Sequence, residues 1–352
     1  MASTYKTLLP EDVATTRTLL HEAIPLTGTI LSGTYTNDSN IKTFAHGMFE
    51  SIYDYPYLSS SANHVLDITM GYTSASAIVG DIQSSKKVNI YNQMALILNQ
   101  MSLSGTVKNF DRDGEMDEDV SDDMQQVFFL SFARLLTKDE IKKNSFRLSY
   151  YTSASAPLSA SGRYFPFTIG DYGADINYKT NSPAGDYGLL FSASSPTPGG
   201  ADNPSIGHLY YQTGIAVITA SIFSGAFGPP SPETLLGGVN QVLHNGTITQ
   251  FADGVRFAID NIQFNNTTEL NSTIYFCRAH NTDFNYSSNP TYITSGSEIV
   301  VKGNNMLANP VSYLTTVGLY SPDNELMAVA KVSEPLKKSP SNEITLRVRL
   351  DY

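Results

Sequence analysis

The densest group of chemically capable side chains in this sequence is the acidic tract NFDRDGEMDEDVSDD, residues 109–123. Counted from Asn109 as position 1, oxygen-bearing side chains occupy positions 1, 3, 5 and 9, and Gly114 occupies position 6. Calcium-binding loops use this spacing because alternate side chains converge on the ion and the glycine permits a sharp turn. The candidate metal ligands are therefore Asn109, Asp111, Asp113 and Asp117.

One position of the tract departs from that pattern. Position 12 is Val120, where a calcium loop has a bidentate glutamate, so two of about seven oxygens are missing. Residues 111–123 hold eight acidic side chains and one arginine, so the tract carries most of the local charge excess. Three interpretations remain: a solvated loop, a divalent-cation site with Ca²⁺ as the only candidate cofactor, and a docking surface for a basic partner.

Other constellations that could support catalysis are missing from the sequence. It contains neither a G-x-S-x-G nucleophile elbow nor a phosphate-binding G-x-x-x-x-G-K-[ST] loop, and His21-Glu22 lacks the second histidine of a zinc protease. The six histidines are scattered, and Cys277 is the only cysteine, which excludes an intrachain disulfide and a cysteine-based zinc site. We expect no enzyme, no catalytic residue and no organic cofactor.

The composition restricts the possible partners. Charged residues make up 16% of the 352 residues, against about 25% in typical domains, and the net charge is −11. Nucleic acid is an unexpected partner because no basic cluster is present. No run approaches the ~18 consecutive apolar residues of a membrane span. A surface so poor in charge must be covered by uncharged polar residues and tyrosine, or by partner subunits.

The elements that would position these residues suggest a mixed fold. Four segments before residue 145 show apolar residues at helical spacing or helix-start signals: 8–23, 42–56, 89–101 and 122–140. After Phe146 the sequence turns to aromatic and β-branched runs separated by Gly, Pro, Asn and Ser, with one weak helical segment at 232–246. We therefore predict an α+β fold, with a helix-bearing α/β segment 1–145 that includes the acidic loop 109–123. A β-rich, antiparallel, sandwich-like domain follows over 146–352.

The end of the chain predicts three antiparallel strands. Residues 311–320 and 326–332 alternate in polarity around the turn SPDNE, with Tyr313, Thr315, Val317 and Leu319 on one face of the first strand. Leu326, Ala328, Ala330 and Val332 share a face of the second strand. The last segment, EITLRVRLDY, places Ile344, Leu346, Val348, Leu350 and Tyr352 on one face. Such a tail completes a sheet, either its own or that of a neighbouring subunit.

The hairpin also resembles a segment that recurs in virion proteins of tailed bacteriophages, notably tail-fibre and baseplate-associated proteins. Those segments read as a threonine-containing strand ending in G-[LF]-[YF], a short Asp/Asn turn, a strand L-[IL]-A-V-[AG]-K and a proline-containing exit. The similarity covers about 28 residues, and its matching residues are Thr315, Val317, Gly318, Leu319, Tyr320, Asp323, Asn324, Leu326, Ala328, Val329, Ala330, Lys331 and Pro335. In fibres the segment lies near the particle-attached N-terminus, whereas here it is C-terminal, which favours a compact component of the particle.

This resemblance implies a virion structural protein of the tail, baseplate or neck, made in the host cytoplasm. It would bind other virion proteins and copies of itself in a symmetric homo-oligomeric assembly, without nucleic acid or membrane. The residues expected to carry fold and assembly are Val317, Gly318, Leu319, Tyr320, Leu326, Val329 and Arg347. The alternatives are a receptor- or glycan-binding module, a capsid-side decoration or head-closure protein, and a hydrolase on a β-rich scaffold.

Overall fold

The computed structural model describes residues 5–27, 38–77, 80–102, 104–116, 122–151, 166–192, 205–223, 245–285 and 310–352. The chain forms two compact units: unit 1 comprises Met1–Leu19 and Glu269–Tyr352, and unit 2 comprises Leu20–Thr268. Strands β1 (Val13–Thr27) and β12 (Ile259–Ala279) contribute residues to both units. The expected domain boundary between residues 145 and 146 lies inside unit 2.

The larger sheet of unit 2 has seven antiparallel strands in the spatial order β2-β3-β4-β5-β11-β10-β9. Most side chains of β4 and β5 are buried on both faces, because helices and the second sheet of unit 2 pack against them. The strands are β2 (Ile41–Thr43), β3 (Glu50–Tyr53), β4 (His64–Tyr72), β5 (Gln126–Phe132), β9 (Tyr187–Leu190), β10 (Gly207–Tyr210) and β11 (Ile215–Thr219).

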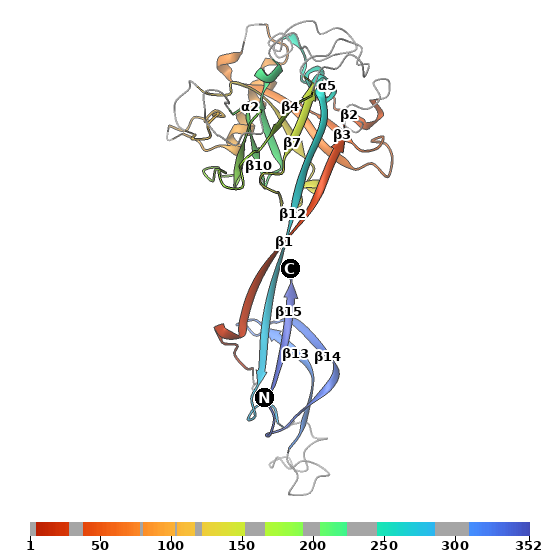
Figure 1. The fold of residues 1–352 in the computed structure, drawn as a ribbon, viewed down its shortest axis with the longest axis vertical. Coiled ribbons are helices and arrows are strands. Elements are labelled where there is room, and N and C mark those ends of the chain that lie inside the picture. Colours follow the sequence, from red (N-terminus) through yellow and green to blue (C-terminus); the bar gives the residue numbers. More distant parts are fainter. Residues whose placement is uncertain are drawn as a thin grey trace. The chain divides into compact units, whose positions relative to one another are not determined.

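Helices α2 (Ser84–Leu98) and α5 (Ile248–Ala258) pack against β4 (Figure 1). The close approach of α2 requires a glycine, because a Cβ at Gly71 would lie 2.7 Å from the Tyr91 backbone nitrogen. The α5 N-terminus is a capping box, in which Thr247 Oγ1 accepts from the Gln250 amide at 3.1 Å and Gln250 Oε1 accepts from the Thr247 amide at 2.9 Å. Each end of the box satisfies a backbone donor that the helix leaves unpaired.

The second sheet is organised around β12. Within unit 2, β12 pairs with β7 (Arg147–Tyr151) and with β6 (Glu140–Ile141), and β7 pairs with β8 (Pro166–Gly170). The rings of Phe132 on β5, Phe146 before β7 and Phe264 on β12 pack together with centroids 5.2 to 6.5 Å apart. This aromatic cluster joins the two sheets of unit 2, and the main hydrophobic core of the described residues, from Leu26 to Phe264, lies within this unit.

Unit 1 contains the C-terminal strands. Strand β15 (Ile344–Asp351) pairs antiparallel with β12, from Ser272 opposite Asp351 to Ala279 opposite Ile344. Strands β13 (Ser312–Tyr320) and β14 (Leu326–Lys338) form a separate two-stranded antiparallel ribbon (Figure 1). The three predicted C-terminal strands are thereby confirmed. The ribbon departs from regular alternation at register shifts between Leu314 and Thr316 and between Leu319 and Tyr320.

The predicted α+β fold class is wrong, because the described chain is dominated by strands in unit 2 as well as in unit 1. Of the four predicted N-terminal helical segments, only 89–101 is mainly helical, as part of α2. Segment 8–23 contains a 3-10 turn and most of β1, and segment 42–56 contains β3 and the end of β2. The β-rich character predicted for the C-terminal part is confirmed, and it extends to the N-terminal part.

Segment 122–140 shows why the pattern misled. It contains β5 and the single-turn helix α3 (Arg134–Thr137). A strand buried on both faces reads as a continuous apolar run, and such a run has no period-2 signal to separate it from a helix. Conversely, the α5 helix was missed, although its Thr247-to-Gln250 capping box was a usable signal. Most of the predicted helical segment 232–246 lies outside the described residues.

The remaining short elements are 3-10 turns: η1 (Pro10–Asp12), η2 (Asp38–Asn40), η3 (Ser74–Ser76) and η4 (Ala220–Phe223).

No helix in the described part of the chain is long and apolar enough to cross a membrane.

Candidate functional site

The acidic loop is closed at its base by backbone pairing. The Met124 amide donates to the Phe110 carbonyl at 2.7 Å, and Asp111 and Asp123 form an antiparallel bridge. From β9, the Tyr187 hydroxyl donates to the carbonyl of Gly114 at 2.9 Å. The loop of unit 2 is therefore held at both its base and its turn by the surrounding fold.

Three carboxylates of this loop converge. Oxygens of Asp111, Asp113 and Asp122 lie within 4.8 Å of one another. The Nδ2 of the predicted ligand Asn109 donates to Asp123 at 2.7 Å. The predicted ligand Asp117 lies outside the described residues. Of the four sequence-predicted ligands, the structure brings together Asp111 and Asp113 and adds Asp122.

The three converging carboxylates fit the spacing of a calcium loop whose first position is Asp111 instead of Asn109. In that register Asp113 is position 3, and Asp122 fills position 12, which holds a carboxylate in calcium loops. Position 6 is then Met116, whose backbone has φ +55°, the left-handed conformation for which such loops use glycine. The Met116 amide donates to the Asp111 carboxylate across this turn at 2.8 Å.

The surroundings of the cluster disfavour free negative charges on Asp111 and Asp113. Burial raises the pKa of Asp111, and the neighbouring Asp122 carboxyl group adds to the rise. Burial also raises the pKa of Asp113, with a further contribution from Asp111, against the lowering effect of Lys179. Asp122 Oδ1 is buried and has no hydrogen-bond partner within the part of the chain that the structure describes. Three such oxygens could ligate a divalent cation, which would offset their mutual repulsion.

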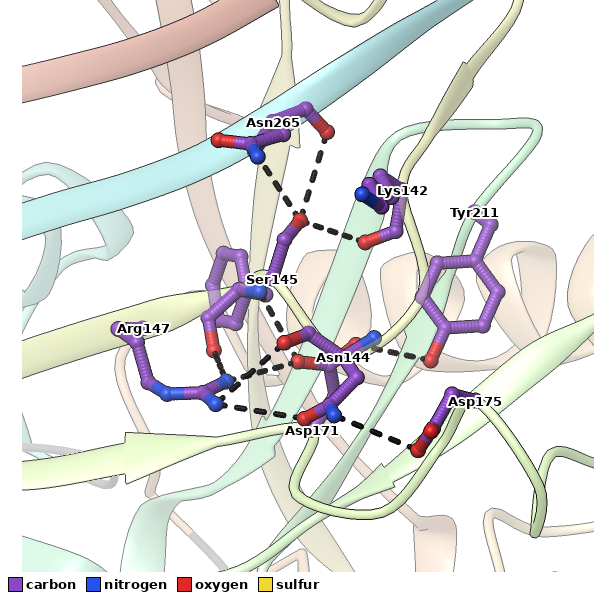
Figure 2. A network of polar contacts seen from close by, with 9 residues as sticks. Lys142, Asn144, Ser145, Arg147, Asp171, Asp175, Tyr211 and Asn265 are labelled. Atoms are coloured by element: carbon purple, nitrogen blue, oxygen red, sulfur yellow. Dashed lines mark hydrogen bonds and ion pairs between the residues drawn. The ribbon is translucent and has the colours of Figure 1, made fainter. Parts of the chain in front are cut away.

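A second polar cluster in unit 2 is centred on the fully buried Asp171 (Figure 2). Its carboxylate accepts from the backbone amides of Asn144 at 2.7 Å and Phe146 at 2.9 Å. The side chains of Tyr211 and Arg147 donate to it at 3.0 and 3.1 Å. Burial raises the pKa of Asp171 to about 6, although these four donors lower it.

A neighbouring serine extends the network around Asp171 to β12. Figure 2 shows Ser145 between Lys142 and Asn265, donating to the Lys142 carbonyl at 2.5 Å and accepting from the Asn265 amide at 3.0 Å. Both oxygens of Asp171 are already engaged by donors, so the cluster is built to fix the segment before β7. Sequence reasoning missed it, because its members are spread over 124 positions from Lys142 to Asn265 and share no motif.

A serine, an aspartate and a histidine also meet on strands β3 and β4. Ser51 Oγ donates to Asp67 Oδ1 at 2.5 Å, and His64 Nε2 lies 2.8 Å from the same oxygen. In a nucleophilic triad the histidine stands between serine and carboxylate and takes the serine proton. Here the carboxylate stands in the middle, and its hydrogen bond raises the pKa of His64. The arrangement therefore cannot activate Ser51 through His64.

Unit 2 has a hollow of about 490 Å³ beside β2 and β3. Its wall includes Pro56 and Tyr57, which end the aromatic run of residues 53–57, the next residue Leu58, and the carboxylate of Asp253. Asp253 is paired with Arg256 at 2.7 Å. Aromatic faces beside carboxylates are the groups that bind sugars, through stacking and hydrogen bonds.

The predicted assembly residues lie on two different strand pairs of unit 1. On the β13–β14 ribbon Val317 stands opposite Ala330 and Gly318 opposite Val329, whereas Arg347 is on β15, opposite Phe276 of β12. Val317 and Leu319 are half-buried, and the other predicted ribbon residues are exposed. The ribbon residues so placed are Val317, Gly318, Leu319, Tyr320, Leu326 and Val329.

Unit 1 buries little apolar surface. Among its described residues only Ala279 and Val348 are buried hydrophobic side chains. Its other buried residues are polar: Asp12, Ser272, Thr273, Lys338 and Ser339. A two-stranded hairpin is marginally stable by itself, because it buries too little apolar surface without further strands or a helix packed on it. The described part of unit 1 therefore lacks the core that usually stabilises a sheet.

Comparisons with protein-family models, curated proteins and solved structures find no match to this chain.

Proposed function

We propose that this protein is a structural component of a tailed-bacteriophage particle, in the tail, baseplate or neck, and that it acts by binding between subunits. The observation that carries the proposal is the near absence of buried apolar side chains among the described residues of unit 1, beside exposed Tyr, Leu, Met and Val on its ribbon. Sheet surfaces with this character gain stability when another subunit covers them. The resemblance of the hairpin to segments of tail-fibre and baseplate proteins supports the same proposal.

The charge distribution supports a role in assembly. Unit 1 carries nine basic and ten acidic side chains, whereas unit 2 carries 13 and 23. A unit with balanced charges can approach neighbouring subunits without net electrostatic repulsion. The strongly acidic unit would keep unassembled chains soluble through mutual repulsion.

The test is the position of the protein in the particle. Particles from the phage that encodes the chain are purified, separated into heads and tails, and analysed by quantitative mass spectrometry. We expect its peptides in the tail fraction at a fixed stoichiometry. Their presence in heads alone would favour a capsid-side decoration or head-closure protein, and their absence from washed particles would contradict a structural role.

A glycan-binding module of the tail is the second candidate function. The hollow beside β2 and β3 favours it, because Tyr57 lies there with the carboxylate of Asp253. A glycan array with the full chain tests this candidate, using Tyr57→Ala as the variant and Tyr55→Ala, an exposed tyrosine outside the hollow, as the control. Binding that Tyr57→Ala abolishes and Tyr55→Ala retains would support it, and a clean array would reject it.

A further inference from the structure

The exposed apolar side chains of the β13–β14 ribbon gather on one face. The side chains of Tyr320 and Leu326 lie over Gly318, because a Cβ there would stand 3.0 and 3.2 Å from them. Val329 is opposite Gly318 and points to the same side. We call this surface the ribbon patch, and its residues are Tyr320, Leu326, Met327 and Val329, with the ring of Tyr5 packed at a tilt against Tyr320, 4.7 Å between ring centroids.

The ribbon patch is exposed to an extent that is unusual for large apolar residues. Leu326 and Val329 are each 52% exposed and Met327 is 70% exposed. Single exposed apolar residues are common on protein surfaces, but a contiguous group marks an interaction site. The patch is contiguous, because Leu326 and Met327 are adjacent at the register shift beside Tyr320.

Charges of opposite sign stand at the two ends of the ribbon patch. Asp323 and Glu325 lie in the turn, and Lys331 lies two residues beyond Val329 on the same face of β14. All three are exposed, and none forms an ion pair with another residue of the described part of the chain. Along the ribbon the order is therefore acidic, apolar, basic.

This order is self-complementary under a two-fold rotation. Glu325 and Lys331 are six residues apart, about 20 Å along a strand. When two ribbons meet face to face in opposite directions, the acidic end of each meets the basic end of the other, and the apolar middles coincide. A two-fold interface uses the same surface on both subunits, so this pattern fits a second copy of the chain.

The net charges of the units also favour a second copy that approaches through unit 1. Two copies of unit 2, each with ten more acidic than basic side chains, repel each other. Two copies of unit 1, each with an excess of one acidic side chain, do not. Association through the ribbon patch also covers apolar side chains in the unit whose described residues bury only two.

We propose that two copies of this protein pair through their ribbon patches about a two-fold axis, with Glu325 of each copy beside Lys331 of the other. This inference rests on the proposed function in one respect, namely that the ribbon is an assembly surface. It adds the identity of the partner, the orientation of the two ribbons and the charge pairs that set it.

Charge reversal with cross-complementation tests the pairing. The full chain is studied by sedimentation equilibrium as Glu325→Lys, as Lys331→Glu and as an equimolar mixture of the two variants. In a dimer of either variant alone, both copies of the 325–331 contact join like charges. We therefore expect the dimer dissociation constant to rise about tenfold or more. In the mixture every contact again joins opposite charges, so dimers that contain one copy of each variant should form with the affinity of the unchanged protein.

Two further variants complete the experiment. Val329→Glu places a charge in the apolar middle, and we expect it to prevent dimers both alone and in the mixtures. Glu11→Lys makes the same charge change as Glu325→Lys at an exposed position of unit 1 outside the ribbon, and it should dimerise normally. Far-UV circular dichroism and thermal melting of each variant verify that it is folded.

The outcomes separate this inference from the proposed function. A purified chain that stays monomeric at all accessible concentrations, or folded variants whose mixture does not recover dimers, overturns the pairing. If such a chain is nevertheless found in tail fractions, the structural role stands with a different partner. Recovered dimers together with absence from particles would establish the pairing and reject the virion role.

Discussion

The Tyr211 hydroxyl donates to the Asp171 carboxylate at 3.0 Å, in a position where both side chains are fully buried. Tyr211 follows β10 and Asp171 follows β8, so this bond joins the two sheets of unit 2. The same hydroxyl occupies the space beside Gly188, where a Cβ would lie 2.0 Å from it. The Tyr211 hydroxyl therefore stabilises the Asp171 carboxylate and also packs closely against Gly188 of β9.

Tyr211→Phe should destabilise the protein by about 2 kcal/mol, because a hydrogen bond to a buried charged group is lost without a replacement. Urea unfolding measured by circular dichroism checks this value. Tyr178→Phe is the matched control, since Tyr178 is partly exposed and its ring, which packs against Lys143, is retained. Equal stabilities of the two variants would contradict a stabilising role for the bond.

The pH dependence of stability should reveal Asp171. Its pKa is about 6 in the folded protein, above the ordinary value of 3.8, so the folded state binds a proton more tightly than the unfolded state. Protonated Asp171 contributes its whole stabilisation of the folded state below about pH 4. As the pH rises to about 6 this contribution is lost, and the free energy of unfolding falls by on the order of 2–3 kcal/mol. The difference in unfolding free energy between the protein and Asp171→Asn should therefore decrease from pH 4 to pH 7. A difference that is constant over this range would refute the assignment.

The calcium-loop hypothesis, with Asp111 as its first ligand, makes a prediction that separates it from the register that begins at Asn109. Isothermal titration with Ca²⁺ should show binding that Asp122→Asn weakens about tenfold or more, because position 12 loses its charge. Asn109→Ala should change the affinity less than twofold, since in this register Asn109 precedes the first ligand. An absence of heat at millimolar Ca²⁺ would remove the cation site and leave a solvated or partner-binding loop.

Hydrogen exchange should differ sharply between the units. Amides of the β13–β14 ribbon should exchange orders of magnitude faster than those of β4 and β5, because the ribbon has little buried surface to resist local opening. Exchange in the ribbon should slow as the protein concentration rises, if copies cover one another, while β4 and β5 should not respond. Uniform protection across both units would contradict the description of unit 1 as poorly buried.

The C-terminal hairpin was predictable because its signal is local. The turn at Asp323-Asn324, with Asn324 at φ +63°, and the strands on either side are specified by residues within 30 positions of one another. The detail of which side chains are exposed was not predictable. Tyr313 was expected to share a face with Val317, but a register shift between Leu314 and Thr316 leaves Tyr313 exposed and Val317 half-buried.

The acidic loop was also visible in the sequence, but its register was not. Composition alone identified the tract, because eight acids in 13 residues are conspicuous in a chain with 16% charged residues. Which carboxylates converge depends on the pairing of Asp111 with Asp123, which closes the loop and brings Asp122 to the cluster. The spacing of residues along the chain does not show which carboxylates converge, because the Asp111–Asp123 pairing forms in the folded unit, where Tyr187 of β9 also holds the loop.

By itself, the sequence determined the features that arise from neighbouring residues: the hairpin, the final strand, the α2 helix and the presence of an acidic loop. Only the tertiary structure decided that Gln126–Phe132 is a central strand, that Asp171 gathers four donors, and that unit 1 is assembled from both ends of the chain. The physical reason is that burial on two faces removes the periodicity from which a strand is recognised. Contacts between distant segments, in turn, depend on a fold that no short stretch of sequence specifies.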